Sequence, residues 1–409
     1  MQTWMASRFR SSPALDLKRL DELPAEQQHA FRELQRDADF YGLLVPRAAG
    51  SANIKSVGSQ TAGLFRSLAA PARLDASLLD DASYRDDIVD LVLDGVLEIE
   101  IGGAFCSGAD AFRIVASELP APVDHGHIGM LSREALQYAG DLPTRDAAEL
   151  TSALYTYNRM PRTRAWIARF PDRDAVLAHI GAVRGATAAL LDCHWVRTPP
   201  DPGNSWISWQ SRTRHPALST QHAMTWKLYV SPHPEHLGDA FGALVRVLAN
   251  LPGSQMKIGH DAAGLLRPDK LVAYFRTRED LGSAARALAI ELKGCPAHGV
   301  PFTAGFLGSS VPREGGTEQP SNRATEQPLS DGLLSWGIDP PDSQRPLSWL
   351  DRESWRLWIA KSLAGALAMA KGATRPSVEP WRFAVERVRR HGVDVDSWTP
   401  MDTLWRSVA

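Results

Sequence analysis

The chain has 409 residues, which is long enough for more than one domain and a sizeable apolar core. Its 45 lysine and arginine residues nearly balance its 47 aspartate and glutamate residues, which excludes a global field that would attract nucleic acid or an anionic membrane. The three cysteines are scattered and odd in number, so we expect a reducing compartment and no disulfide framework. Any anion site must therefore be a local cluster of cations.

The first residues do not look like a targeting segment. Arg8 and Arg10 are not followed by an apolar stretch, and no run approaches the roughly 18 apolar residues that a membrane-spanning helix needs. We therefore expect a cytoplasmic protein with neither a membrane nor a nucleic acid among its partners.

Residues 1–118 are expected to form a separate, mostly helical unit. Helical patterns cover residues 15–41 and 75–93, and the stretch 97–106 predicts a β-hairpin because it alternates around a Gly102-Gly103 turn. A helix followed by a hairpin resembles the wing of a winged-helix unit, whose edge can accept a peptide strand. A hairpin that closes a helical cap is the alternative. We expect this unit to recruit a peptide or partner and to be dispensable for chemistry.

The second unit is predicted to span residues 130–409 and to begin with helices over 131–191. Residues 155–159 include Tyr155, Tyr157, Asn158 and Arg159, a polar and aromatic cluster at a helix end that Pro161 terminates. Its simplest interpretation is packing against a sheet. A strand-like stretch at 206–209 is then followed by the cations Arg212 and Arg214.

The centre of this unit is residues 226–275, which predict strand, helix, strand, loop and strand. Lys227, Lys257 and Lys270 fall at or near the strands of one small antiparallel sheet, so they could converge on a shared anion. Lysines on the solvated face of a sheet are the alternative. The fold class expected is α+β.

The C-terminal part contains one segment with almost no apolar residues and two amphipathic helices. Residues 308–329 are rich in Gly, Ser, Pro and Glu, which predicts a mobile insert. Residues 354–371 and 381–390 predict helices, and Arg356 lies in the first turn of the former, where the helix dipole favours an anion.

Several site classes are excluded or disfavoured by the motifs. The pair His125 and His127 lacks a third ligand nearby, as do Cys193-His194 and Cys295 with His298, so we predict no metal. No phosphate-binding GxxxxGK[ST] loop, kinase motif set or GxSxG elbow is present, so nucleotide-dependent transfer and serine hydrolysis lack their machinery. No cofactor is expected.

Three runs of sequence resemble a known family. They are WKLYVSP at 226–232, MKIGHDAAGLLRPDKLVAYF at 256–275 and SWRLWIAKSLAGAL at 354–367. Together they resemble the HopA-type effector family, whose relatives occur as lyase components in class V lanthipeptide and thioamitide biosynthesis. More distantly, they are similar to phosphothreonine lyases of the OspF and SpvC type. The resemblance covers residues 155–367 and leaves the N-terminal unit unassigned.

The resemblance implies roles for individual residues. In those lyases a strand carries Lys-x-His, in which the lysine holds phosphate and the histidine is the general acid, and a later lysine is the base. Lys227 matches the first lysine, and Lys257 stands thirty positions on (257 − 227 = 30). Tyr229 occupies the place of the histidine, so either the tyrosine is the acid or the full lyase chemistry is lost.

Further residues match the family's phosphate-contacting stretch or lie near it. The resemblance implies phosphate binding by Lys227 and by four more residues, which are Arg267, Lys270, Tyr274 and Arg356. Tyr157, Arg212 and Arg214 are the candidates for substrate binding.

The function expected is β-elimination of phosphate from phosphoserine or phosphothreonine in a precursor peptide, which a separate kinase-like phosphotransferase would phosphorylate. Lysine is a base only when neutral, so Lys257 needs a pKa lowered by burial or by neighbouring cations such as Lys227 and Arg267. The same cations would stabilise the leaving phosphate. The alternative is a non-catalytic peptide-binding or scaffold component of a modification complex.

Overall fold

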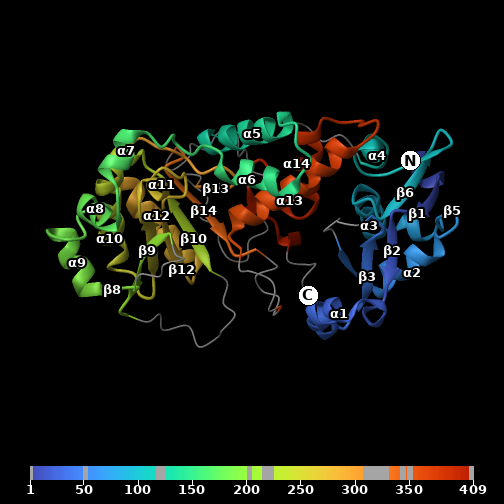
Figure 1. Ribbon diagram of the computed structural model, residues 1–409, viewed down its shortest axis with the longest axis horizontal. Coiled ribbons are helices and arrows are strands. Elements are labelled where there is room, and N and C mark those ends of the chain that lie inside the picture. The colour runs from blue at the N-terminus through green and yellow to red at the C-terminus, as the bar shows by residue number, and fades with distance from the viewer. Residues whose placement is uncertain are drawn as a thin grey trace.

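The structure, a computed structural model, describes residues 3–48, 54–116, 126–199, 205–213, 225–306, 331–340, 347 and 353–404. The fold class is α+β, as predicted. Figure 1 shows the N-terminal strands at one end of an elongated molecule, a larger antiparallel sheet at the other end, and long helices between them. The predicted insert at 308–329 lies outside the described residues, as do His125 and Arg214.

The N-terminal part contains two small antiparallel sheets. The first has the order β5 (Ala72–Arg73), β1 (Arg8–Ser11), β6 (Leu97–Ile101), β7 (Ala104–Cys106). The second has the order β2 (Leu15–Lys18), β3 (Phe40–Pro46), β4 (Lys55–Gly58). The helices of this part are α1 (Ala25–Phe31), α2 (Ser59–Ser67), α3 (Ala82–Leu93) and α4 (Gly108–Val115).

The predicted hairpin at 97–106 is present as β6 and β7. Its turn residues Gly102 and Gly103 have φ values of 57° and 84°, in the left-handed region that glycine enters without steric cost. Ile101 pairs with Ala104 across the turn, and β7 forms one edge of its sheet. The hairpin therefore belongs to a four-stranded sheet.

The predicted helix over residues 15–41 is wrong for most of its length. Residues 15–18 form β2, which pairs with β3, and α1 covers only Ala25–Phe31 between short 3-10 turns. Pairing with β3 overrides the local helical pattern because it places Leu15 and Leu17 against the apolar cluster of Leu44, Val57 and Phe65. The prediction at 75–93 is confirmed in its second half by α3.

The large sheet has seven strands, and every pairing in it is antiparallel. Its order is β13 (Ala304–Gly305), β14 (Leu334–Ile338), β10 (Trp226–Val230), β12 (Leu271–Phe275), β11 (Gln255–Gly259), β9 (Trp206–Ser211), β8 (Trp195–Arg197). The strands predicted within 226–275 are therefore the central ones.

One face of this sheet is apolar and is covered by helices. Ile207, Leu228, Met256 and Ala273 belong to a core cluster that also contains Phe241 of α10. The helices around this part are α7 (Arg164–Arg169), α8 (Arg173–His179), α9 (Ala186–His194), α10 (Leu237–Leu248), α11 (Ala262–Leu265) and α12 (Arg278–Glu291). Because strand side chains alternate, the polar residues of the same strands point to the opposite face.

A second core joins the two ends of the chain. It contains Phe9, Ile88 and Phe112 from the N-terminal part together with Trp355 and Phe383 from the C-terminal part. The helices that share it or flank it are α5 (Gly126–Asp141), α6 (Ala147–Thr156), α13 (Trp355–Gly372) and α14 (Pro380–Arg390). A short pair of strands, β15 (Val393–Asp394) and β16 (Thr399–Pro400), follows α14. The N-terminal unit thus packs directly on the C-terminal helices.

Among the described residues, no helix has the length and apolar character needed to cross a membrane.

Candidate active site

The polar face of the large sheet gathers most of the residues singled out by the resemblance. Lys227 of β10 lies opposite Tyr274 of β12, while Tyr229 and Lys257 both lie opposite Val272 of that strand. Residues at directly opposed or alternate positions share a face, so Lys227, Tyr229, Lys257 and Tyr274 extend to the same side. The two lysines flank β12 from its two neighbouring strands.

Lys257 lies between aromatic rings. Its Nζ is 4.3 Å from the centroid of the Trp206 ring and 5.4 Å from that of Tyr274. Within the described ranges no carboxylate lies within ion-pair distance of it. Burial lowers the pKa of Lys257 to about 8, and the charges of Lys227 and Arg267 add to this while Asp269 opposes it. The lysine is therefore partly neutral near physiological pH.

Lys227 is held by a carboxylate. Its Nζ donates to Asp339 Oδ1 at 2.6 Å, and the other oxygen of Asp339 accepts from the Thr225 backbone N–H at 3.2 Å. Asp339 directly follows β14, the neighbour of β10. A carboxylate fixed in this way positions the ammonium group on the sheet face and competes with any other anion for it.

The carboxylate of Asp269 is contacted by two arginines and a tyrosine. Arg267 donates to both of its carboxylate oxygens at 2.8 Å, and the Tyr155 hydroxyl donates to Oδ2 at 3.2 Å. Nη1 of Arg356 lies 3.4 Å from the same Oδ2. Burial works to raise the pKa of Asp269, but Arg356 and Arg267 outweigh it and hold the pKa far below its usual range. The carboxylate stays charged.

Arg356 is more deeply placed than a surface phosphate ligand would be. Its side chain is 1% exposed, and it donates to the carbonyl oxygens of Pro301 at 3.2 Å and Tyr155 at 2.7 Å. The guanidinium carbon lies 4.7 Å from the Tyr155 ring centroid. Nη1 makes no hydrogen bond within the described part of the chain. Arg356 thus anchors α6 from α13 through the backbone carbonyl of Tyr155, and its Nη1 forms the ion pair with Asp269.

Tyr229 is buried, and its hydroxyl has no hydrogen-bond partner among the residues that the structure describes. Burial raises its pKa well above 10, and the nearby charge of Asp269 adds to this effect. A phenol with such a pKa holds its proton and can donate a hydrogen bond. A buried polar group without a partner is rare in folded proteins, and here it accompanies the unbonded Nη1 of Arg356.

Lys270 is on the same side of the strand but makes its bonds elsewhere. It is 0% exposed and donates to the Pro232 carbonyl at 3.0 Å and to His298 Nδ1 at 2.7 Å. Nε2 of His298 therefore carries the proton and donates to the Asn158 carbonyl at 2.6 Å. Burial lowers the pKa of Lys270 to about 7 and that of His298 to about 3. The pair is a buried structural link beside Lys227, Lys257, Arg267 and Arg356, which we call the cation cluster.

The candidates for substrate binding are more dispersed. Arg212 is exposed just beyond β9, four positions after Ser208, the residue opposite Lys257. The Tyr157 hydroxyl donates to Glu134 of α5 at 3.4 Å, and its ring lies 5.8 Å from that of Tyr138. Arg214 falls outside the described residues. Neither Tyr157 nor Arg212 bonds to a residue of the cation cluster.

Sequence reasoning missed several residues of the cluster. Trp206 covers Lys257 and also lies 5.0 Å from the Arg267 guanidinium, while Asp269 and Asp339 hold the cations. The sequence pattern places Tyr155 only in the polar and aromatic cluster at a helix end. The one available signal was the Arg-Pro-Asp-Lys run, because a carboxylate two positions after an arginine can bond back to it.

No group of three or more histidine, cysteine, aspartate or glutamate side chains in the described part of the chain has the arrangement of a metal site.

Comparisons with known proteins show a low structural similarity to solved proteins. No protein-family model matches the chain, and no curated protein matches it. The solved effector protein from Pseudomonas syringae pv. tomato strain DC3000 is similar with a TM-score of 0.37 and 11% identity, over 67% of this chain and 97% of that one. The effector from Pseudomonas syringae pv. syringae strain 61 gives 0.34 and 10%, over 66% and 98%. Likeness at this level assigns neither a family nor an activity.

Proposed function

We propose that the protein is a carbon–oxygen lyase that eliminates phosphate from phosphoserine or phosphothreonine in a precursor peptide, leaving dehydroalanine or dehydrobutyrine. The observation that carries the proposal is the shared face of Lys257, Lys227 and Tyr229, with Arg267 beside them. A phosphorylated peptide of ribosomal natural-product biosynthesis is the proposed substrate, and a separate kinase-like phosphotransferase would supply it. The reaction needs no cofactor.

Lys257 is the proposed base. With a pKa of about 8, about a tenth of it is neutral at pH 7, against fewer than one in a thousand for a lysine at its ordinary pKa. The neutral amine takes the α-proton, and the electrons of that C–H bond form the double bond between the α and β carbons. The bond from the β carbon to the phosphate oxygen then breaks, and phosphate leaves with the electron pair.

Lys227 and Arg267 are the proposed ligands of the leaving phosphate. Among the described residues, Lys227 bonds only to Asp339, and Arg267 bonds to Asp269 and Tyr155 through Nε and Nη2, which leaves its Nη1. Positive groups fixed in advance stabilise charge that develops on the leaving oxygens. They also offset the rise in the Lys257 pKa that a bound phosphate would cause.

Tyr229 is the proposed hydrogen-bond donor to the bridging or terminal phosphate oxygen. Its raised pKa argues against full proton transfer at neutral pH. The phosphate monoester has a second pKa near 6, so a fraction of the substrate already carries a proton that leaves with the phosphate as hydrogen phosphate. For that fraction the elimination balances without another acid.

A non-catalytic scaffold is the second candidate. Two observations favour it. Asp269 already binds the guanidinium of Arg267, and Tyr229, which the resemblance places at the position of the lyases' general-acid histidine, is buried. Such a protein would bind a phosphopeptide and present it to another enzyme.

Incubation with a synthetic phosphoserine peptide separates the two candidates without need of the kinase. The lyase proposal expects the peptide to lose the elements of phosphoric acid, seen by mass spectrometry, and the product to add a thiol. Tight binding without any loss of phosphate, even when the kinase partner is supplied, would instead favour the scaffold.

A further inference from the structure

A row of exposed arginines extends outward from the cation cluster. Residues 150–171 contain four arginines and no aspartate or glutamate, although the chain as a whole carries slightly more acids than bases. Arg159 and Arg162 lie between α6 and α7, Arg164 is the first residue of α7, and all three are exposed. We call these three residues the arginine strip.

The strip is attached to the candidate active site by backbone bonds. The Met160 N–H donates to the Leu266 carbonyl at 3.0 Å. Arg159 directly precedes Met160 and Arg267 directly follows Leu266, so this hydrogen bond brings the backbone of the strip to that of the site. The Asn158 side chain donates to the carbonyls of His298 and Gly299 at 2.8 and 3.1 Å. Asn158 itself has a φ of 62°, in the left-handed region. The turn that begins the strip is thus fixed on both sides.

The cations of the site act electrostatically on Arg159, the first residue of the strip. Burial lowers the pKa of Arg159, and the charges of Arg267, Arg356 and Arg162 act on it in the same direction. Asp269 opposes them but is already bonded to Arg267. Within the described ranges, no carboxylate lies within ion-pair distance of any residue of the strip. Three guanidinium groups are therefore available to an outside partner.

We infer that the arginine strip binds an acidic segment of the substrate peptide next to the phosphorylated residue. The inference rests on the proposed function, because the strip leads directly from the residues proposed to hold phosphate. Arginine suits this role since its planar guanidinium can bind a carboxylate through two parallel hydrogen bonds. Each arginine–carboxylate pair between the strip and the peptide is exposed to solvent. The strip therefore contributes to the selectivity and the association rate of binding rather than to most of the affinity.

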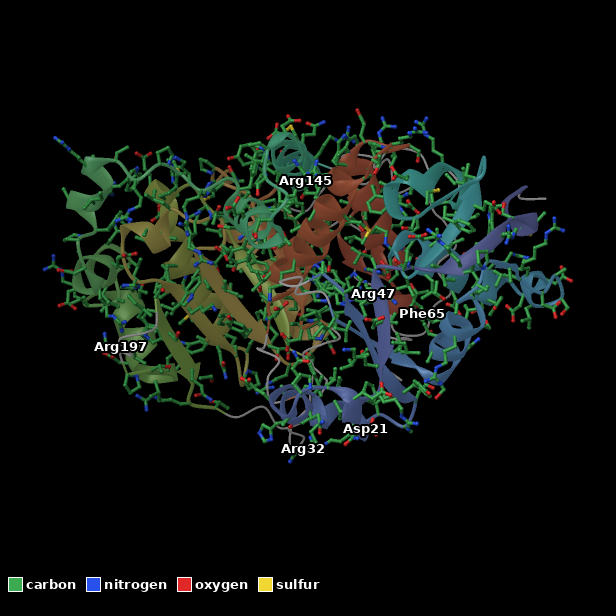
Figure 2. All side chains as sticks on the ribbon, turned by 45° about the vertical axis from the view of Figure 1, so that its right-hand side comes forward. Asp21, Arg32, Arg47, Phe65, Arg145 and Arg197 are labelled. Atoms are coloured by element: carbon green, nitrogen blue, oxygen red, sulfur yellow. The ribbon has the colours of Figure 1, made fainter. Side chains whose placement is uncertain are left out.

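The matched control is Arg197, another exposed arginine. It ends β8, at the opposite end of the sheet region from α7 in Figure 1, and it is labelled in Figure 2. Its replacement removes the same charge from the protein without touching the strip.

The test compares two fluorescein-labelled phosphoserine peptides, one with four glutamates beside the phosphoserine and one with four glutamines. We expect the wild-type protein to prefer the glutamate peptide by about tenfold at moderate salt. Arg162→Ala combined with Arg164→Ala should remove most of that preference and leave the affinity for the glutamine peptide within about twofold. Arg197→Ala should keep the preference.

Three results would overturn the inference. They are equal affinity of the wild-type protein for the two peptides, an unchanged preference in the double variant, and an equal loss on Arg197→Ala. Binding of phosphatidylserine vesicles that depends on the strip, without any glutamate preference, would also overturn it and point to a membrane surface. A serine peptide without phosphate separates the two proposals: if it binds as well as the phosphopeptide, the proposed function fails, while the glutamate preference still decides the strip.

Discussion

Lys227 and Asp339 form an ion pair of 2.6 Å on the polar face of the large sheet. If Lys227 binds the leaving phosphate, Asp339 competes with that phosphate for the same ammonium group. We therefore expect Asp339→Asn to tighten phosphopeptide binding by about threefold and Lys227→Met to weaken it by about tenfold. Isothermal titration with the phosphopeptide measures both.

The unphosphorylated peptide is the control for this pair of variants, because its affinity should not change in either. If both variants bound the phosphopeptide as the wild-type protein does, Lys227 would have no part in phosphate binding.

Tyr229→Phe tests the buried hydroxyl that lacks a partner. The change keeps the ring and its packing, so we expect the melting temperature to stay the same or to rise, since an unsatisfied polar group is removed. The elimination rate should fall by about a hundredfold if the hydroxyl donates to the phosphate. A rate within twofold of the wild-type value would mean that the cation cluster alone suffices.

The lowered pKa of buried Lys270 predicts that the stability of the protein depends on pH. Its pKa is about 7 in the folded protein and about 10.4 when unfolded, so between these values the unfolded state binds more protons than the folded state. Stability should therefore rise with pH above about 7. Between pH 7 and 10, the rise in unfolding free energy should be smaller in Lys270→Met than in the wild-type protein, by on the order of 2 kcal/mol.

Urea unfolding at several pH values provides this measurement, and Lys293→Met, at an exposed position, is the control. Parallel curves for the wild-type protein and Lys270→Met would contradict the assignment.

The strands and helices of residues 226–275 could be predicted from the sequence because their signals are local. The alternation around Lys227, the three- and four-residue repeat in α10 and the stop at Pro252-Gly253 each lie within one element. The central role of Asp269 could not be predicted in this way. Its partners Tyr155 and Arg356 come from helices α6 and α13, which are far apart in the sequence. No local sequence pattern indicates that both side chains contact one carboxylate.

The N-terminal unit illustrates the same limit. The Gly-Gly turn predicts the hairpin of β6 and β7. The local pattern of β2 predicts a helix instead, because its strand conformation depends on pairing with β3. The packing of α4 on α14, where the rings of Phe112 and Phe383 lie 5.9 Å apart, also depends on residues distant in sequence. Deleting residues 1–118 would uncover this core, so point substitutions are the better test of the unit's role.

Arg387 of α14 joins the C-terminal helices to α3. It is 3% exposed and donates to Asp90 at 2.7 Å and to Asp94 at 2.6 Å. Burial works to raise the pKa of Asp94, but the charges of Arg387, Lys55 and His391 together outweigh it and keep the pKa low. Arg387→Met removes the cation bonded to Asp94 and one of the two bonded to Asp90, which Arg390 still holds at 2.7 Å. We expect a loss of about 2 kcal/mol in unfolding free energy.

Arg382→Met is the matched control on the same helix, because Arg382 pairs with Glu379 at the surface. It should cost less than about 0.5 kcal/mol in a urea titration. Equal losses in the two variants would show that the link between α3 and α14 adds nothing specific.

Lys257→Ala tests the central claim most directly, with elimination followed by mass spectrometry and binding followed by titration on the same phosphoserine peptide. The change removes the proposed proton acceptor and only one of several cations, so the loss of the elements of phosphoric acid should cease while the affinity falls by less than about tenfold. In the wild-type protein the rate should rise with pH towards the Lys257 pKa of about 8, as the amine becomes neutral. Elimination at an undiminished rate by Lys257→Ala would contradict the assignment of Lys257 as the base.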